Sequence, residues 1–276
     1  MKVVIQQSLG RVGQGIASSL VWVPNFDPTM WESSNKPIMD MFDELKPDIV
    51  FISGENFSNR SIEFVKRIYP KTILVCVGEI SDCIVEPNLC INDFHHSNLA
   101  TIVFSDGPML GRIGRPSVDD YLKSDIVCIT NNIEKIEGLD KQIIEYVSSM
   151  SDVVFKAFGT KKIPVKNYLG IVDSQTEANA INSSKIVLDL DGGSGYDGLW
   201  LKKNVITTKD TDFSKRVTNV LECKQAIDEV IDSEERADLK IYVQTRTYFD
   251  LLCNVFRFIG LEEPANYMMQ KKGELI

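Results

Sequence analysis

The sequence predicts an α/β protein with two parallel-sheet domains in tandem and a C-terminal helix that packs back on the first domain. Short apolar runs alternate with helical patterns along most of the chain. One run, Val153–Phe158, ends directly in Gly159, and another, Ile186–Leu190, leads into the glycine-rich turn Gly192–Gly195. Runs of this length, bounded by glycine and separated by helices, are typical of parallel strands with crossover helices.

The first half of the chain predicts a βαβαβ arrangement. Its first strand is Lys2–Gln6, and we expect a loop around Gly10, Gly13 and Gly15 after it. Apolar residues at helical spacing predict a helix over Lys36–Leu45 and a second one that ends at Ile68, with Ser58 as a suitable N-cap. The remaining strands are predicted at Ile49–Ser53, Ile73–Val77 and Ile102–Phe104. Units of this kind form a parallel sheet with right-handed crossovers.

The second half repeats the alternation. A strand over Ile126–Thr130 and a helix over Leu139–Ser148 precede the run that ends at Gly159, and a last strand is predicted at Val205–Thr207. Residues 223–232 have helical spacing, and a longer helix is predicted over about Leu239–Ile259. The polar stretch 112–124 contains glycine and proline and marks a domain boundary. We therefore predict domains at 1–118 and 119–235, and a returning helix within 236–276.

Composition excludes some classes of protein. The 276 residues are 43% hydrophobic, so a buried core is expected. No apolar run approaches the ~18–20 residues of a membrane helix, and the N-terminus lacks the apolar core of a signal peptide, so we expect a soluble cytoplasmic protein. The net charge of −9 argues against general nucleic-acid binding but leaves a local basic groove open.

The cysteines do not indicate disulfides or a metal site. Most of the six lie inside apolar runs, which favours reduced, buried thiols. Cys83, Cys90, His95 and His96 lack the spacing of zinc ligands. No metal is predicted.

Several segments carry a resemblance to a known family. In chain order they are IVFISGENF, KTILVCVGEI, SDIVCITNN, GTKKIPVKNYLG and KIVLDL. This series resembles the phage DNA β-glucosyltransferases, which add a sugar to hydroxymethylated cytosine, and the block from NYLG to NVITT resembles bacterial spore-maturation-like glycosyltransferases. The resemblance implies the GT-B plan of two Rossmann-like domains. The first of these domains binds the acceptor, and the second binds a nucleotide-sugar donor.

The predicted donor site uses the glycine turns at strand ends. Glycine there permits close backbone approach, and Lys161 or Lys162 is placed to counter phosphate charge. In the related families a Glu in the helix before the last donor strand contacts the ribose, but this chain has Gly198 or its neighbour at that place. Asp197 is the acid nearest to it and is the alternative ribose contact. The predicted donor-binding residues are Gly159, Thr160, Lys161, Tyr168, Gly193, Ser194, Gly195, Tyr196 and Asp197.

The catalytic base is predicted among strand-end acids of the first half. Glu79 follows the strand at the place where the resemblance implies the catalytic acid, and Asp106, after the next strand, is its competitor. A carboxylate can remove the acceptor proton as the sugar is transferred. The pair His95–His96 is a further alternative. The predicted acceptor-binding residues are Ser8, Arg11, Arg112 and Arg115.

These inferences predict an inverting, metal-independent glycosyltransferase. We expect no cofactor other than the co-substrate, a nucleotide-diphosphate sugar such as a UDP-sugar. The resemblance favours a 5-hydroxymethylated pyrimidine in phage-type DNA as acceptor, with the enzyme in the host cytoplasm if phage-encoded. A cell-surface glycan or protein acceptor, an inactive nucleotide-sugar-binding protein and a nicotinamide-dependent oxidoreductase are the alternatives. Oligomeric state is left open.

Overall fold

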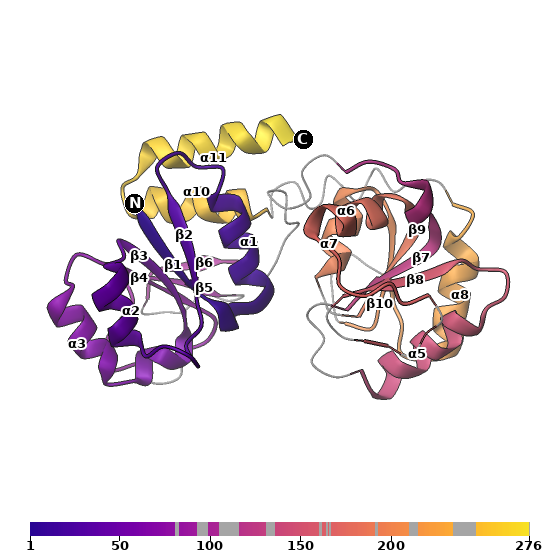
Figure 1. Ribbon diagram of the computed structural model, residues 1–276, viewed down its shortest axis with the longest axis horizontal. Coiled ribbons are helices and arrows are strands. Elements are labelled where there is room, and N and C mark those ends of the chain that lie inside the picture. Colours follow the sequence, from indigo (N-terminus) through magenta and orange to yellow (C-terminus); the bar gives the residue numbers. More distant parts are fainter. Residues whose placement is uncertain are drawn as a thin grey trace. The chain divides into compact units, whose positions relative to one another are not determined.

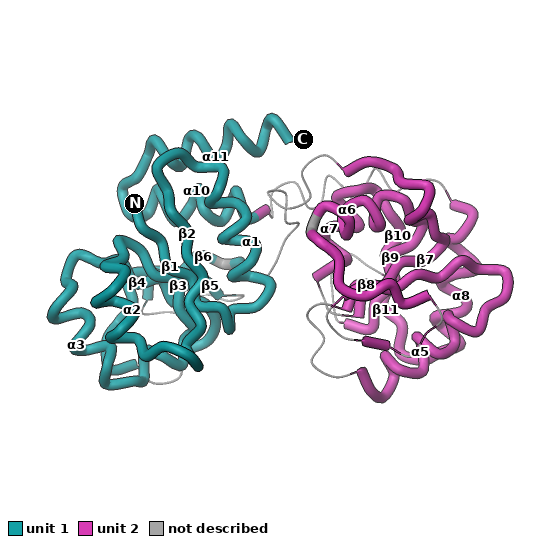
Figure 2. Tube along the Cα trace, viewed as in Figure 1, with its two compact units in different colours: residues 1–111, 248–276 teal, residues 112–247 magenta. Residues whose placement is uncertain are grey.

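The computed structural model of the chain (Figure 1) describes residues 1–80, 83–92, 99–104, 116–130, 136–159, 162–163, 165, 167–190, 193–209, 215–233 and 247–275. The chain divides into two compact units (Figure 2). Unit 1 consists of 1–111 and 248–276, and unit 2 of 112–247. Each unit contains one parallel sheet, and the C-terminal segment belongs to unit 1, which confirms the predicted fold class.

Unit 1 is built on a six-stranded parallel sheet with the order β2-β1-β3-β4-β5-β6. In chain order its elements, with η for a 3₁₀ helix, are β1 (Lys2–Gln6), η1 (Gln7–Leu9), α1 (Gly10–Leu20), β2 (Asp27–Trp31), α2 (Ile38–Leu45), β3 (Ile49–Ser53), η2 (Gly54–Ser58), α3 (Ser61–Ile68), β4 (Ile73–Val77), β5 (Leu89–Asn92), β6 (Thr101–Val103), α10 (Tyr248–Phe258) and α11 (Glu262–Leu275).

Helices cover both faces of this sheet. On one face, apolar residues of α2 and α3 such as Phe42 and Val65 pack with Val50, Ile52 and Leu74 of the strands. On the other face α1 contacts α10, and α10 contacts β6. Alternate residues of each strand therefore meet different helices, which explains the continuous apolar runs of the sequence.

The predicted loop around Gly10, Gly13 and Gly15 is wrong, because these residues form the first part of α1. Glycine disfavours a helix by about 1 kcal/mol relative to alanine, and this is why the local pattern pointed to a loop. A Cβ added at Gly15 would lie 2.3 Å from a ring carbon of the fully buried Tyr248. Tyr248 of α10 therefore leaves no room for a side chain at position 15, which explains the glycine there.

The helix predicted over about Leu239–Ile259 agrees with α10 at its end, Phe258. A further helix, α11, was not predicted and follows α10 after Gly260, where φ is +78°. Residues 239–246 lie outside the described part. Lys272 of α11 donates to both carboxylate oxygens of Asp250 of α10, at 2.6 and 2.8 Å, and so joins the two helices.

Smaller differences concern element ends and short strands. Helix α3 begins at Ser61 instead of following an N-cap at Ser58, and the Asn59 side chain accepts from the Ser61 N–H. The strands β2 and β5 were not predicted. The first is an edge strand that contains Pro28, which only an edge strand readily accepts, and the second has four residues.

Unit 2 contains a five-stranded parallel sheet with the order β11-β10-β9-β7-β8. Its described elements are η3 (Asp120–Leu122), β7 (Ser124–Ile129), α5 (Gly138–Ser149), β8 (Phe155–Phe158), α6 (Ser174–Asn182), β9 (Ser184–Asp189), α7 (Ser194–Trp200), β10 (Asn204–Thr207), β11 (Lys215–Arg216) and α8 (Val220–Val230).

The helices of unit 2 also form two layers. Ile143 and Ile144 of α5 and Ile227 of α8 belong to one core with Ile186 and Leu188 of β9. Helix α7 contacts β9 and β10, and α6 contacts α7. Asp173 caps α6, because its carboxylate accepts from the Thr176 N–H and hydroxyl, and these hydrogen bonds hold the pKa of Asp173 below its usual range.

The structure also describes the state of the cysteines and the hydropathy of the helices. Cys76, Cys90, Cys128, Cys223 and Cys253 are free and buried, whereas Cys83 is free and exposed. In the part of the chain that the structure describes, no helix is long and apolar enough to cross a membrane.

Candidate functional site

The strand order of unit 2 defines where a ligand is expected. The chain passes from β7 to β8 on one side and then returns to β9 on the other side of β7. In open parallel sheets of this kind, ligands bind outside the carboxyl ends of the strands, where the winding direction changes. The expected crevice therefore lies beyond the ends of β7 and β9, next to Thr130 and Asp189.

Gly159 lies at this edge and is fixed by close packing. Its φ is +131°, and a Cβ added there would lie 2.6 Å from the Thr130 Oγ1. Its N–H donates to the Gly170 carbonyl at 3.0 Å, and its own carbonyl accepts from the Tyr168 hydroxyl. These groups already have partners, so a donor contact in this loop would come from the residues that follow. Lys162 is exposed, whereas Thr160 and Lys161 lie outside the described residues.

The second predicted donor segment forms the start of α7. Ser194 Oγ donates to Asp189 Oδ1 at 3.0 Å, and a Cβ added at Gly195 would lie 2.6 Å from Asp189 Oδ2. A Cβ added at Gly198 would lie 2.8 Å from Val187. The glycines thus let α7 lie directly on β9, and this packing explains why Gly198 replaces the expected Glu.

The side chains of this segment are mostly buried. Asp197 is 2% exposed and Tyr196 is 7% exposed. In this structure the segment packs against the end of β9, at Asp189. The ribose contact predicted for Asp197 stays a prediction.

A charged pair at the same edge was not found from the sequence. Lys209, just after β10, lies 3.3 Å from Asp140 Oδ2 in the first turn of α5, and the Thr208 hydroxyl donates to Asp140 Oδ1 at 2.6 Å. Thr208 and Lys209 are 68 and 69 positions from Asp140 in the sequence, so no local sequence pattern connects them.

Unit 1 has a corresponding point between β1 and β3, because β2 lies on one side of β1 and β3 on the other. Gln6, at the end of β1, is 1% exposed. Its Oε1 accepts from the Ser53 N–H at 2.9 Å and from Asn56 Nδ2 at 3.0 Å, and its Nε2 donates to Ser33 Oγ at 3.3 Å. The sequence analysis did not single out Gln6, because a glutamine at the end of a strand has no distinctive pattern.

Two carboxylates lie near this point. Glu79 follows β4 and is exposed, and a Cβ added at Gly54 would lie 1.8 Å from the Glu79 carbonyl oxygen. Glu55 directly follows Gly54, is also exposed and accepts from Ser53 Oγ at 3.2 Å. The structure thus brings the backbone beside Glu55 against that of Glu79 and adds Glu55 to the candidate bases.

The remaining predicted residues have mixed outcomes. Ser8 is exposed in η1, whereas Arg11 is only 9% exposed in α1. Asp106, Arg112, Arg115, His95 and His96 lie outside the described residues. Among the side chains that the structure describes, no group of three or more His, Cys, Asp or Glu is arranged to hold a metal ion.

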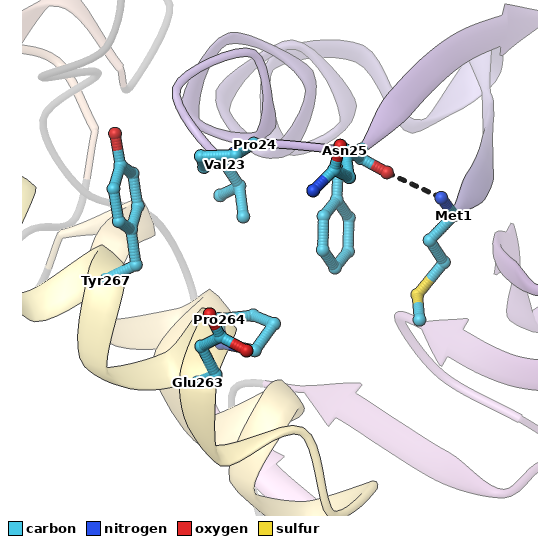
Figure 3. A pocket seen from close by; sticks show the side chains of 8 residues that line it. Met1, Val23, Pro24, Asn25, Glu263, Pro264 and Tyr267 are labelled. Carbon is cyan, nitrogen blue, oxygen red and sulfur yellow. Dashed lines mark hydrogen bonds between the residues drawn. The ribbon is translucent and has the colours of Figure 1, made fainter.

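A separate cavity of about 310 Å³ lies at the other edge of the unit 1 sheet (Figure 3). It is lined by Met1, by the connection between α1 and β2, and by Glu263, Pro264 and Tyr267 of α11. The Met1 amino group donates to the Asn25 carbonyl beside it. Because these residues precede β1 and β2, the cavity is at the amino edge, away from Gln6 and Glu79.

Comparisons with solved structures show the same architecture. The S. aureus MnaA–UDP co-structure matches with a TM-score of 0.56 and 11% identity over 94% of this chain and 96% of that one. The spinosyn forosaminyltransferase SpnP matches with a TM-score of 0.53 and 10% identity over 94% and 99%. A Listeria monocytogenes protein assigned as a UDP-N-acetylglucosamine 2-epimerase matches with a TM-score of 0.51 and 12% identity over 96% and 94%.

The chain shares the GT-B-like fold of these proteins. No family model matches the sequence, and no curated protein matches it. At these identities the likeness establishes the fold, and the chemistry must be argued from the residues.

Proposed function

We propose that the protein is a glycosyltransferase that takes a sugar from a nucleotide-diphosphate sugar and transfers it to an acceptor hydroxyl. The observation that carries the proposal is the change of winding direction between β7 and β9 of unit 2, with glycine turns and Lys209 beside it. The shared fold supports it, since one similar structure contains UDP and another is a forosaminyltransferase.

The proposed chemistry assigns a role to each unit. Unit 2 holds the donor, and Glu79 of unit 1 removes the proton of the acceptor hydroxyl. The acceptor oxygen bonds to the anomeric carbon, while the bond from that carbon to the phosphate oxygen breaks and the diphosphate leaves with the electron pair. Attack from the opposite face inverts the anomeric centre. Lysine side chains and backbone N–H groups stabilise the diphosphate charge, so the mechanism requires no metal ion.

The acceptor that we propose first is a 5-hydroxymethylated pyrimidine in phage-type DNA. It rests on the sequence resemblance. Among the described basic residues, Lys66 and Arg67 end α3 and Lys71 precedes β4, so all three lie at the amino edge of the sheet, opposite Glu79. Arg11 is buried. Arg60, the N-cap residue of α3, is exposed at the same edge as Glu79. The predicted Arg112 and Arg115 lie outside the described residues.

This acceptor is tested by titrating hydroxymethylated duplex DNA at two salt concentrations, together with a sugar-transfer assay. Phosphate contacts predict affinity that falls steeply with salt, and Arg112→Ala and Arg115→Ala should weaken binding to every sequence. Salt-independent binding, or no transfer with several donors, would favour a cell-surface glycan or protein acceptor.

Epimerisation of a nucleotide sugar is the second candidate function, because one similar structure is assigned as a 2-epimerase. A nucleotide-sugar-binding protein without turnover is a third candidate, favoured by Gly198 at the place of the expected Glu. Analysis of the sugar after incubation separates them. An epimerase changes the sugar while it is still attached to the nucleotide, a transferase releases the nucleoside diphosphate, and a binding protein does neither.

The donor is tested by thermal denaturation of the full chain with a panel of nucleotide sugars. A ligand at about 100 times its dissociation constant stabilises the folded state by about 2.7 kcal/mol. We expect such a shift with at least one nucleotide-diphosphate sugar. No shift with any member of the panel would contradict the proposal.

A further inference from the structure

The ion pair between Lys209 and Asp140 joins two parts of unit 2 that the sheet separates. Asp140 lies at the start of α5, which follows β7, whereas Lys209 follows β10. Strand β9 lies between β7 and β10 in the sheet. Both residues are at the carboxyl edge, so the pair bridges the end of β9, where the winding direction changes and where a ligand is expected.

The backbone of Lys209 is anchored to this edge. Its N–H donates to Thr207 Oγ1 at 3.0 Å, and the Thr207 hydroxyl donates to the Asp189 carbonyl of β9 at 2.7 Å. Thr207 is fully buried. The base of the lysine side chain is thus fixed at the end of β9, while its four-carbon stem leaves the ammonium group able to reach a different partner.

The two partners differ in how firmly they are held. The Lys209 side chain is 45% exposed, whereas that of Asp140 is 15% exposed and also accepts from Thr208. The Lys209 ammonium group can therefore exchange its partner for a ligand phosphate, while the Thr208 hydroxyl still donates to Asp140 and the first turn of α5 favours the negative charge of Asp140.

We propose that Lys209 binds the diphosphate of the nucleotide sugar and that Asp140 holds the lysine at the crevice until the ligand arrives. The inference rests on the proposed function, and it adds a binding residue that neither the glycine turns nor the resemblance indicated. A diphosphate carries more negative charge than the single carboxylate of Asp140, so the ammonium group favours it.

The pair between Lys185 and Asp125 provides a matched control. It lies in the same unit, at 2.9 Å, and its lysine side chain is 53% exposed. Lys185 is near the start of β9, so this pair is at the amino edge, away from the expected crevice. A lysine that acts only as a surface charge should behave like Lys185.

The test is calorimetric titration of the full chain with UDP, dTDP, GDP and ADP, and with the corresponding monophosphates. For the diphosphate that binds, Lys209→Gln should lower affinity about tenfold, with less effect on the monophosphate, whereas Lys209→Arg should retain affinity. Asp140→Asn, which removes the competing carboxylate, should leave affinity unchanged or raise it. Lys185→Gln should have no effect.

The outcomes separate the inference from the function on which it rests. Unchanged diphosphate affinity in Lys209→Gln, or equal losses for diphosphate and monophosphate, would overturn the role of Lys209 and leave the donor site intact. If the unmodified chain binds none of the four diphosphates, both the inference and the proposed function are contradicted.

Discussion

Gly54 lies directly against the backbone carbonyl of Glu79, so closely that a Cβ at position 54 would be 1.8 Å from that oxygen. The contact holds the residue after β3 against the backbone of Glu79, which follows β4. Only glycine permits this approach.

Gly54→Ala should therefore destabilise the protein by about 1–3 kcal/mol, because an added methyl group forces the two backbones apart. Denaturant unfolding measures the loss. Gly273→Ala is the matched control, since a Cβ there meets nothing within 4 Å and the residue lies in α11. The control should be neutral or slightly stabilising, and equal losses in both variants would contradict the steric explanation.

Glu79→Gln should reduce sugar transfer by about 10²–10⁴-fold, the usual range for a lost general base, and leave nucleotide binding unchanged. Release of nucleoside diphosphate measures the first quantity and calorimetry the second. Glu55→Gln is the comparison, because Glu55 is also exposed and adjoins the same contact. If Glu55→Gln abolishes turnover and Glu79→Gln does not, the base is Glu55.

Lys272→Met should destabilise unit 1 by roughly 2–4 kcal/mol, because it leaves the Asp250 carboxylate without its ammonium partner in a largely buried place. The side chains of Lys272 and Asp250 are 9% and 19% exposed. The neighbouring Lys271 pairs with the more exposed Glu274, so Lys271→Met should cost much less. The two unfolding free energies test this, and a larger cost at Lys271 would refute the assignment.

Asp125 should make folding depend on pH. Burial alone raises the pKa of Asp125, but hydrogen bonds from Lys185 and the Val154 N–H, with the charge of Lys185, outweigh it and hold the pKa below its usual value. A carboxyl with a lowered folded-state pKa contributes stability above its unfolded pKa of about 3.9 and loses it as pH falls through the folded value.

The stability difference between the unmodified chain and Asp125→Asn should therefore shrink as pH falls from about 5 to below the folded-state pKa of Asp125. Denaturant unfolding across this range measures it. Lys185→Gln removes one cause of the shift and should reduce the pH dependence. A difference that is constant with pH would show that Asp125 does not contribute through its charge.

Several strands could be predicted from the sequence because their signal is local. The bounds of β1, β3 and β4 agree with the predicted runs, since each is an apolar stretch that ends at polar or glycine residues. The helices α2, α5 and α8 were predicted to within a few residues from their apolar spacing. A period of two or of 3.6 residues is contained in a short window of sequence, and the GT-B-like plan follows from the order of these elements.

The tertiary structure decided which residues that are far apart in the sequence come into contact. Tyr248, from the other end of the chain, packs on Gly15 of α1, in a segment whose glycines by themselves predicted a loop. Gln6 meets Ser53 across 47 positions, and Lys209 meets Asp140 across 69. These neighbours are set by strand order, and strand order depends on which faces bury their apolar area together. The sequence by itself therefore determined the elements and the class of fold, whereas folding determined which polar side chains meet at the carboxyl edges.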